Sequence, residues 1–257
     1  MQAEDQIRRA AELLASSQHA VALTGAGHST PSGVPDFRSP GSGLWESVDP
    51  MEVASIYGFQ RNPRAFYDWI RPLAKQMMEA HPNAAHLALA ELERVGTIKA
   101  VITQNIDELH HRAGSKRVLE LHGSVRQATC TKCRRKVSSR EIWPAFVAGG
   151  DVPHCPSCGG LLKPDVVLFG ELLPVGTLLE AQQEADVCDV MLVAGSSLEV
   201  YPAAGLPMRA TQHGAQVIVV NYEPTHMDEH SAVVLHEDVA ITLPKIAAKV
   251  KEIKGMV

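Results

Sequence analysis

Four of the five cysteines stand in two C-x-x-C pairs, a spacing that suits a metal site. Cys130 and Cys133 form the first pair, and Cys155 and Cys158 form the second. Two such pairs can bring four thiolates to one tetrahedral centre, which is the arrangement that zinc prefers. Four protein ligands leave no position for water, so we predict a structural Zn²⁺. His154 is an alternative ligand in place of one cysteine.

A glycine-rich turn suits a nucleotide phosphate. Gly25-Ala26-Gly27 follows an apolar run at residues 20–24, and a helix is expected to begin near residues 29–32. Backbone N–H groups in such a turn can approach a pyrophosphate, with the helix N-terminus aimed at its charge. Thr30 stands where the dinucleotide-binding pattern has its third glycine, so a plain strand–helix turn is an equally good interpretation.

Small polar residues follow two other apolar runs. Gly195-Ser196-Ser197 comes after the run at residues 190–194, and Asn221 comes after residues 217–220. Open α/β sheets bind their ligands at the carboxyl ends of strands, and serine and asparagine there suit ribose hydroxyls. An acidic ribose-binding residue at the end of the second strand is not evident, which weakens a dehydrogenase reading.

The segment Thr103-Gln104-Asn105-Ile106-Asp107 places three hydrogen-bonding side chains directly after a third apolar run. One interpretation is recognition of an amide or a ribose. The other is that Asn105 or Asp107 caps the following helix, a role that both residue types favour.

His122 follows the apolar run at residues 118–121. A histidine at the end of a buried strand can act as a general base near neutral pH. The chain has 12 histidines, however, and most histidines are surface or core residues. His110 and His111 compete for the same role on composition alone.

The elements that must position these residues alternate between strands and helices. Several apolar runs lack alternation, which is typical of a parallel sheet covered on both faces. Helical patterns lie between them, so we predict an α/β fold with a doubly wound parallel sheet. The expected strands are 20–24, 100–103, 118–121, 166–169, 190–194 and 217–220, and the expected helices are 7–16, 84–95, 175–185 and 203–212. Residues 40–82, rich in aromatic side chains, and residues 125–164 interrupt this pattern and are interpreted as a second, smaller domain.

Composition narrows the function classes. The 257 residues are 45% hydrophobic and 21% charged, as in ordinary globular proteins. The net charge of −5 argues against nucleic-acid binding, and no apolar run approaches the ~20 residues of a membrane span. The first five residues lack the order of a signal peptide, and paired cysteines suit a reducing compartment. We therefore expect a cytoplasmic protein, with its oligomeric state left open.

Taken together, the motifs resemble the sirtuin family in its compact, prokaryotic-like form. They occur in family order and span nearly the whole chain. The matching segments are Gly25-Ala26-Gly27-His28-Ser29, Ser32-Gly33-Val34-Pro35-Asp36-Phe37-Arg38-Ser39, Thr103-Gln104-Asn105-Ile106-Asp107, Leu121-His122-Gly123, the four cysteines, Val166-Val167-Leu168-Phe169-Gly170-Glu171 and Gly195-Ser196-Ser197-Leu198.

The resemblance implies a Rossmann-like NAD-binding domain with a smaller domain of helical and zinc modules inserted. The implied boundaries are 1–39, 83–124 and 165–257 for the NAD-binding domain, and 40–82 and 125–164 for the small domain. The implied catalytic residues are His122 and Asn105. The implied NAD contacts are Gly25, Ala26, Gly27, Ser29, Thr30, Asp36, Phe37, Arg38, Trp45, Gln104, Asn105, Ile106, Asp107, His122, Gly195, Ser196, Ser197, Asn221, Tyr222, Glu223 and Val239. The implied peptide contacts are Val166, Val167, Phe169, Gly170, Glu171 and Val200.

The implied activity is NAD-dependent deacylation of acetylated lysine in proteins or peptides. NAD is consumed: nicotinamide leaves, the acyl oxygen attacks the vacated ribose carbon, and neutral His122 takes a proton from a ribose hydroxyl. The products are lysine and O-acetyl-ADP-ribose. Mono-ADP-ribosyl transfer, or deacylation of longer or acidic acyl groups, is the alternative; a non-catalytic NAD-binding scaffold is a further one.

Two departures from the family pattern bear on detail. His28 stands where the family usually has a small or apolar residue, and its side chain either lines the pocket or points away. Sirtuins that prefer succinyl or malonyl groups carry Tyr and Arg three residues apart in the helical module. Here Tyr67 is followed at that spacing by Ile70, and Arg71 comes one residue later. We therefore expect short uncharged acyl groups such as acetyl.

Overall fold

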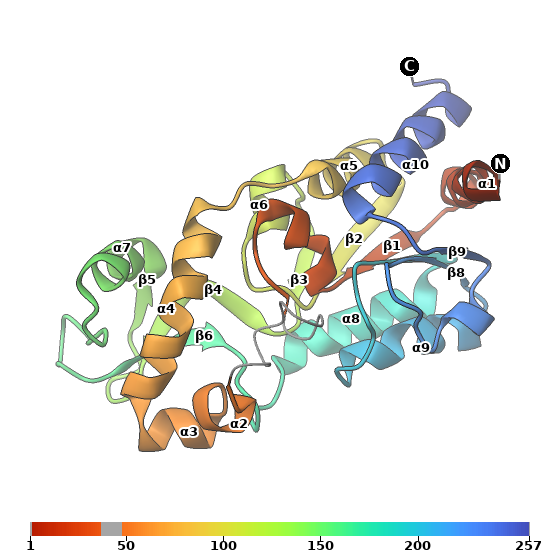
Figure 1. Cartoon of the computed structure of the whole chain (residues 1–257). Coiled ribbons are helices and arrows are strands. Elements are labelled where there is room, and N and C mark those ends of the chain that lie inside the picture. The colour runs from red at the N-terminus through yellow and green to blue at the C-terminus, as the bar shows by residue number, and fades with distance from the viewer. Residues whose placement is uncertain (1, 37–47, 257) are drawn as a thin grey trace.

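The computed structural model describes residues 2–36 and 48–256, and its main feature is a six-stranded parallel sheet (Figure 1). The strand order is β3-β2-β1-β7-β8-β9. All neighbouring strands run parallel, as the apolar runs predict. The strands are β1 (Ala20–Thr24), β2 (Ile98–Thr103), β3 (Val118–Glu120), β7 (Val190–Ala194), β8 (Gln216–Val220) and β9 (Val233–Leu235).

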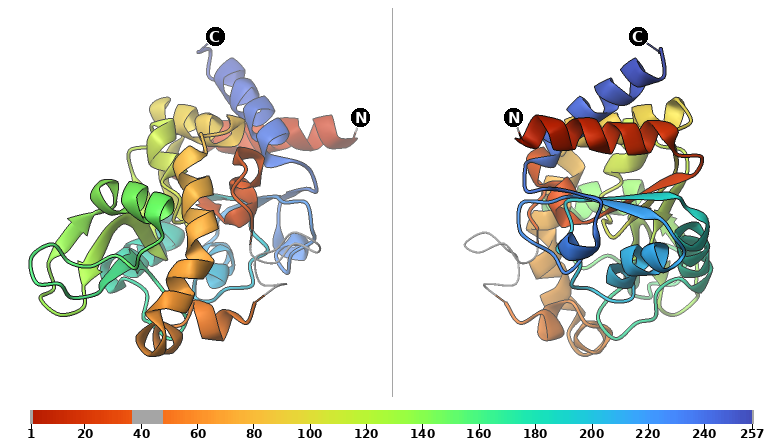
Figure 2. Two further views of the ribbon diagram at one scale, coloured as in Figure 1. Left: turned by 60° about the vertical axis from the view of Figure 1, so that its left-hand side comes forward. Right: turned by 90° about the vertical axis from the view of Figure 1, so that its right-hand side faces the viewer.

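Helices cover both faces of this sheet, which is why its central strands are apolar throughout. Every residue of β1 and β7 is buried. The helices α1, α5 and α10 lie together on one face, and α8 and α9 lie on the other (Figure 2). Their bounds are α1 Gln2–Ser16, α5 Ala84–Arg94, α8 Val175–Val187, α9 Leu206–Gln212 and α10 Val239–Ile253.

The strand order reverses direction between β1 and β7. The chain moves outward from β1 to β2 and β3, returns to β7 beside β1, and moves outward again to β8 and β9. The fold is therefore the doubly wound, Rossmann-like sheet expected from the sequence. In such sheets ligands bind outside the carboxyl ends of the strands at the reversal point. The strand β9, only three residues long, is absent from the sequence prediction.

A second, three-stranded sheet of order β5-β4-β6 lies at the other end of the molecule (Figure 1). A separate apolar core joins it to the helices before residue 82, with Phe59, Phe66, Tyr67 and Phe146 among its members. The elements are α2 Pro50–Val53, α3 Ile56–Arg61, α4 Pro63–Glu79, β4 Gly123–Cys130, β5 Lys136–Ser138, α7 Ser139–Gly149 and β6 Leu162–Val166. The two segments interpreted as insertions thus pack together; the exact domain boundaries stay a prediction.

Two local expectations differ from the structure. The run 166–169 forms no strand of the parallel sheet; β6 ends at Val166 and runs antiparallel to β4, while Phe169 pairs with Ser55. The strand β6 contains Lys163, Pro164 and Asp165, so it does not form an apolar run and was not predicted. After β1 the chain forms two 3-10 turns, Ala26–His28 and Thr30–Ser32, where a helix start was expected.

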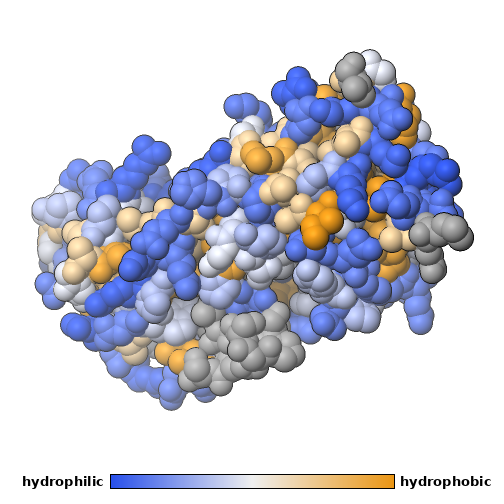
Figure 3. Space-filling model, turned by 45° about the horizontal axis from the view of Figure 1, so that its top comes forward, coloured by the Kyte–Doolittle hydropathy of each residue, from blue (hydrophilic) through white to orange (hydrophobic). Residues whose placement is uncertain are grey.

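The remaining short elements connect these layers. They are the helix α6 (Leu109–Ala113) and the 3-10 turns Ala203–Gly205 and Asp228–His230. Among the described residues, no helix combines the length and the apolar character that a bilayer span requires. On the face shown in Figure 3, hydrophilic residues prevail and the apolar ones form small separate groups.

Candidate active site and metal centre

The loops that follow β1 and β7 touch through their glycines. A Cβ atom on Gly195 would lie 2.2 Å from His28 N, and a Cβ on Gly25 would lie 2.8 Å from Ser196 Cβ. Gly195 also has φ +63°, a left-handed conformation that glycine adopts without strain. The glycine motifs at these two strand ends therefore serve first to bring two backbones into contact at the reversal point.

Asn105, Ser29 and Asp107 form a hydrogen-bonded chain beside these loops. Asn105 Nδ2 donates to Gly25 O at 2.9 Å and to Ser29 Oγ at 3.0 Å. Ser29 Oγ in turn donates to Asp107 Oδ2 at 2.7 Å. The segment after β2 is thereby tied to the glycine loop, although the two are far apart in sequence.

Asp107 has two structural partners at once. Its Oδ1 accepts the N–H of Leu109 at 2.9 Å, where α6 begins, and its Oδ2 accepts from Ser29. Burial raises the pKa of Asp107, and the bonds from Leu109 and Ser29 oppose that rise. The N-cap of α6 is Glu108, so neither Asn105 nor Asp107 occupies the predicted capping position. Asp107 bonds the first N–H of α6 from one residue before the N-cap, whereas Asn105 bonds to the loop.

Gln104 connects three strand ends. Its Nε2 donates to Ser196 Oγ at 3.0 Å, its N–H donates to Thr24 O at 3.0 Å, and its carbonyl oxygen lies 3.0 Å from His122 Nδ1. The ends of β1, β2 and β7 and His122, the second residue after β3, therefore meet within one set of contacts. We call this set, together with the glycine loop 25–29, the carboxyl edge.

The contact of His122 with a carbonyl oxygen decides its tautomer. A carbonyl can only accept, so Nδ1 must carry the hydrogen and donate to Gln104 O. In the neutral ring the lone pair then lies on Nε2, which is the nitrogen able to take a proton. His122 is half-buried, so this nitrogen belongs to a group that is neither in the core nor fully solvated.

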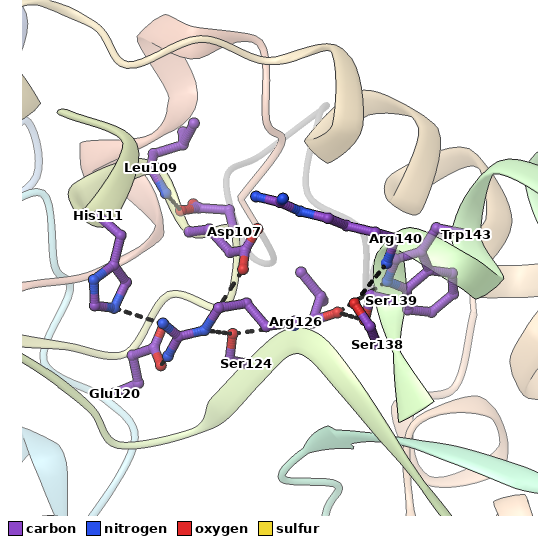
Figure 4. A network of polar contacts seen from close by, with 12 residues as sticks. Asp107, Leu109, His111, Glu120, Ser124, Arg126, Ser138, Ser139, Arg140 and Trp143 are labelled. Atoms are coloured by element: carbon purple, nitrogen blue, oxygen red, sulfur yellow. Dashed lines mark hydrogen bonds and ion pairs between the residues drawn. The ribbon is translucent and has the colours of Figure 1, made fainter. Parts of the chain in front are cut away.

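A network of polar contacts around Arg126 (Figure 4) involves residues that precede and follow His122 in the sequence. Arg126 on β4 pairs with Glu120 at the end of β3, and its Nε donates to Ser124 Oγ at 3.1 Å and lies 3.5 Å from Glu108 Oε1. His111 Nε2 lies 3.5 Å from the same Glu120 carboxylate. Further along β4, Val125 O accepts from Trp143 Nε1 at 2.9 Å and from Ser139 Oγ.

The predicted adenosine-side residues lie at the ends of β8 and β9. Asn221 is buried, its Nδ2 donates to Glu223 O at 2.7 Å, and its backbone N–H donates to Leu235 O. Tyr222 is exposed, and Val239 is buried as the first residue of α10. Gly195 N donates to Val220 O, so this group adjoins the β7 loop.

The predicted peptide-side residues line a short extended segment after β6. Val167 N donates to His122 O at 2.8 Å, and Phe169 exchanges backbone hydrogen bonds with Ala54 and Ile56. Glu171 Oε2 accepts from Leu168 N and pairs with Lys163 Nζ at 2.8 Å, which fixes the turn at Gly170. Val166 is buried, and Val200 is half-buried near the β7 loop.

Other predicted NAD contacts are partly accessible. Ala26, Thr30, Asp36 and Ile106 are half-buried, and Ser197 is exposed. Phe37, Arg38 and Trp45 lie outside the described residues.

Asn83 also contacts the glycine loop but was not predicted from the sequence. Its Nδ2 donates to His28 O and to Ser32 Oγ, and its Oδ1 caps α5. Its signal was an asparagine one residue before a helical run.

The four paired cysteines converge on one point. Their sulfur atoms all lie within 4.8 Å of one another; Cys130 and Cys158 are 3.5 Å apart, and Cys133 and Cys155 are 3.7 Å apart. The N–H groups of Cys133 and Lys132 lower the pKa of Cys130 to about 6, which favours a thiolate. A Cβ on Gly160 would lie 2.8 Å from Cys130 Sγ, so only glycine fits there.

The alternatives at this thiolate cluster are resolved by geometry. His154 is not a member of the cluster; its Nδ1 contacts Val152 O at 2.7 Å. Cys188 is buried in the core beside the sheet, where burial raises its pKa to about 12. The donor set is four sulfurs, which suits Zn²⁺ with no open coordination position.

Comparison with known proteins agrees with this arrangement. The model of the Sir2 family matches residues 25–202. The chain is 52% identical to NAD-dependent protein deacylase 2 of Archaeoglobus fulgidus, over 98% of this chain and 99% of that protein. It is 46% identical to NAD-dependent protein deacetylase of Sulfolobus acidocaldarius, over 97% of each.

Solved structures are similar over the same length. A structure of Sir2Af2 bound to a myristoylated histone peptide has a TM-score of 0.85 and 47% identity, covering 99% of this chain and 100% of that one. A structure of Sir2 with a p53 peptide and NAD⁺ has a TM-score of 0.83 and 41% identity, covering 96% and 97%.

Proposed function

The chain belongs to the Sir2 family, and from this premise we propose that it is an NAD-dependent protein-lysine deacylase. It transfers the acyl group of a modified lysine to the ADP-ribose part of NAD and releases nicotinamide. The observation that carries the proposal is the carboxyl edge, where residues that follow β2 (Asn105, Asp107), β7 (Ser196) and β3 (His122) converge with the glycine loop that follows β1. NAD supplies the electrophilic ribose carbon. The chain positions NAD and the acyl-lysine and provides the group that transfers the proton.

The chemistry of the donor set at the carboxyl edge fits a dinucleotide. Glycine backbones at positions 25, 27 and 195 suit a pyrophosphate, and the side chains of Gln104, Ser196 and Asn221 suit ribose hydroxyls. The predicted contacts at Tyr222, Glu223 and Val239 belong to the adenosine side of the same proposal. The chain from Gly25 to Asp36 would cover the nicotinamide ribose.

Asn105 and Asp107 are proposed to hold the nicotinamide carboxamide. Both side chains are already fixed by Ser29 and the glycine loop, so they need little further ordering when a ligand arrives. Each carboxylate oxygen of Asp107 has one partner in the structure and keeps a second lone pair for an amide hydrogen.

His122 is proposed to act as the general base. Because Nδ1–H is held by Gln104 O, the neutral ring carries its lone pair on Nε2, the nitrogen that would remove a proton from a ribose hydroxyl. Gln104 also touches Ser196, so the group that orients the base belongs to the proposed NAD site. Base and cofactor are thereby positioned by one residue, the base through the Gln104 carbonyl and the cofactor side through the Gln104 side chain.

The acyl-lysine peptide is proposed to bind as an extended chain along residues 166–171, with Val200 beside it. Phe169 and Gly170 there are exposed, and backbone pairing with segment 54–56 fixes the position of Phe169. We propose short uncharged acyl groups. Tyr67 is buried with its hydroxyl donated to Leu162 O, and Arg71 donates to Gly150 O, so neither is poised for an acidic acyl group.

Zn²⁺ is proposed to bind Cys130, Cys133, Cys155 and Cys158 and to cross-link the end of the small sheet. It supplies no chemistry to the reaction, because all four positions are taken by sulfur. Four reduced thiols also support a cytoplasmic location. The proposed division is an NAD-binding domain of residues 1–39, 83–124 and 165–257, with the remainder forming the small domain.

The proposal is tested with NAD and a panel of lysine peptides carrying acetyl, propionyl, myristoyl or succinyl groups. Mass analysis is expected to find nicotinamide, free lysine and O-acyl-ADP-ribose, with acetyl or propionyl peptides turned over fastest. The matched controls are the unmodified peptide and a reaction without NAD. A protein heavier by one ADP-ribose would favour the transferase alternative, and acyl loss without NAD would contradict the proposal.

A further inference from the structure

Three histidines from separate segments meet in the core beside the glycine loop. His28 follows β1, His86 lies in the first turn of α5, and His110 lies in α6. Their exposed fractions are 0%, 0% and 2%. The ring centroids lie 4.6 Å apart for His28–His86, 5.0 Å for His28–His110 and 4.8 Å for His86–His110. We call this group the histidine cluster.

The cluster leaves several nitrogens unsatisfied. Within the described part of the chain, both ring nitrogens of His28, Nε2 of His86 and Nδ1 of His110 have no hydrogen-bond partner. A buried polar atom without a partner costs on the order of 1–3 kcal/mol. Four such atoms in one place indicate that the cluster is completed by something other than protein.

The neighbours of His110 prepare Nδ1 as a ligand atom. When Thr24 Oγ1 donates its hydrogen to Thr103 Oγ1 at 2.9 Å, it accepts from His110 Nε2 at 2.8 Å. In that arrangement the hydrogen of the neutral His110 ring is on Nε2, and the lone pair is on Nδ1. This is the protonation state that a metal ligand requires, with the second nitrogen held by an oriented partner.

The other two rings can offer a lone pair as well. His28 has no partner on either nitrogen, so either tautomer is available. At His86 the N–H of Asn83 approaches Nδ1 at 3.4 Å, a long contact. Coordination through Nε2 places the ring hydrogen on Nδ1 and breaks that contact. Burial and the neighbouring rings lower the pKa of His28 and His110, and burial lowers that of His86 to about 4, so all three are neutral at pH 7.

We propose that His28, His86 and His110 bind one divalent first-row transition-metal ion, with Zn²⁺ as the simplest occupant. One ligand atom from each residue lies within 4.8 Å of the others. With Zn–N bonds of about 2.0–2.1 Å, the ligands of a tetrahedral site lie roughly 3.4 Å apart, so the rings must close by about 1 Å. Sets of three imidazoles hold zinc in known enzymes, and nitrogen-only ligands also suit copper and nickel.

The site differs in strength from the thiolate cluster. Three neutral ligands leave the full charge of the cation in a buried place, whereas four thiolates more than neutralise it. The ion in the histidine cluster is therefore expected to leave first when a chelator is added. While bound, it links the glycine loop to α5 and α6. The inference does not depend on the proposed deacylase activity.

The test is metal content per chain, measured by plasma mass spectrometry on the full chain without a histidine tag after loading with Zn²⁺ and desalting. About two equivalents are expected for the wild type and about one for His28→Ile, since the thiolate site remains. His81→Ala is the matched control, because it removes an exposed histidine, and it is expected to keep both ions.

Cobalt substitution identifies the ligands independently of stability. The wild type is expected to show thiolate-to-cobalt charge-transfer bands plus nitrogen-site bands, and graded chelation should remove the nitrogen-site bands first. His28→Ile should lack only the nitrogen-site bands. The inference is overturned if the wild type binds only about one equivalent of zinc, of copper or of nickel in separate loadings, and its cobalt form shows thiolate bands alone. This outcome is decisive even where the variant fails to fold. Buried water would then be the partner of these nitrogens.

Discussion

The thiolate cluster and the carboxyl edge position their polar groups by opposite routes. Each C-x-x-C pair is folded locally: Cys155 N donates to Gly160 O, and Cys130 Sγ accepts from the N–H of Cys133. The carboxyl edge is assembled across the chain, with Thr24 paired to Thr103 on one side and to Ala194 on the other. The thiolate cluster therefore takes its shape from hydrogen bonds between residues close in sequence, whereas the edge inherits its shape from strand register.

This comparison predicts that changes at the thiolate cluster alter stability and that changes at the edge alter activity. The small sheet has its own minor core, in which Cys130 and Cys155 pack with the buried residues Ala128, Val137 and Leu162. The parallel sheet has two large cores, one on each face. Loss of a metal ligand can thus unfold the small sheet. A single side chain at the carboxyl edge can be removed while the parallel sheet stays folded.

The largest effect is expected for Cys155→Ser. Structural zinc contributes roughly 10–16 kcal/mol of apparent binding free energy to small domains, so losing one thiolate should lower the free energy of unfolding by several kcal/mol. The measurements are urea unfolding and bound zinc. Cys188→Ala is the control, because it removes a cysteine outside the cluster and should keep the ion. An unchanged zinc content and an unchanged urea midpoint in Cys155→Ser would contradict the prediction that the thiolate cluster determines stability.

His122→Ala is expected to reduce kcat by about 10²–10⁴-fold, the usual contribution of a general base. The urea midpoint should stay near the wild-type value, because the imidazole is half-buried and lies outside the large cores. Turnover of an acetyl-lysine peptide with NAD is the readout. His81→Ala, at an exposed site, should turn over normally. If the variant unfolds instead, His122 contributes to stability and the predicted separation between stability and activity fails.

Gly195→Ala should cost about 3 kcal/mol of folding free energy, since it combines left-handed strain with overpacking. Its new Cβ would lie 2.2 Å from His28 N. Gly96 has a similar φ of +75° with open space around it, so Gly96→Ala isolates the strain and should cost about 1 kcal/mol. Denaturant unfolding of both variants gives the difference. Equal losses would show that the two loops do not need their close contact.

Acid should destabilise the protein through the histidine cluster. The pKa of His86 is lowered to about 4 and those of His28 and His110 fall well below 6.5, so the folded state stays neutral while the unfolded state takes up protons. Stability is therefore complete above pH 6.5 and is lost as pH falls towards 4, by about 1.4 kcal/mol per pH unit for each histidine.

The slope is checked by unfolding, at a series of pH values, protein from which mild chelation has removed only the ion of the histidine cluster. His28→Gln should reduce it by about one histidine's share, and His81→Ala should leave it unchanged. An identical slope in the wild type and His28→Gln would mean that the His28 ring is accessible to protons in the folded state.

Sequence reasoning succeeded where the signal was local. The strands β1 and β7 are predicted to the residue, since their runs are apolar throughout, and the C-x-x-C spacing predicts the thiolate cluster. The strand β9 was missed because three residues give too short a pattern. The strand β6 was missed because its polar Lys163 and Asp165 alternate with buried residues in a sheet formed by distant partners.

The candidate site was predictable in membership but not in contacts. The sequence pattern placed Asn105, Asp107 and His122 at strand ends. It did not predict that Ser29 joins Asn105 to Asp107 by hydrogen bonds. The histidine cluster was out of reach, because residues 28, 86 and 110 share no local pattern and meet only through packing of the loop with α5 and α6. His28 is resolved by the structure as a core residue.

One hydrogen bond joins the two places where the chain passes between the sheets. The chain leaves the parallel sheet after β3, passes through His122 and enters the small sheet at Gly123; it returns after Val166, and Val167 N donates to His122 O at 2.8 Å. His122 thus stands where the chain crosses from one sheet to the other. The proposed base is therefore anchored twice, at its carbonyl oxygen by Val167 and at its ring by Gln104.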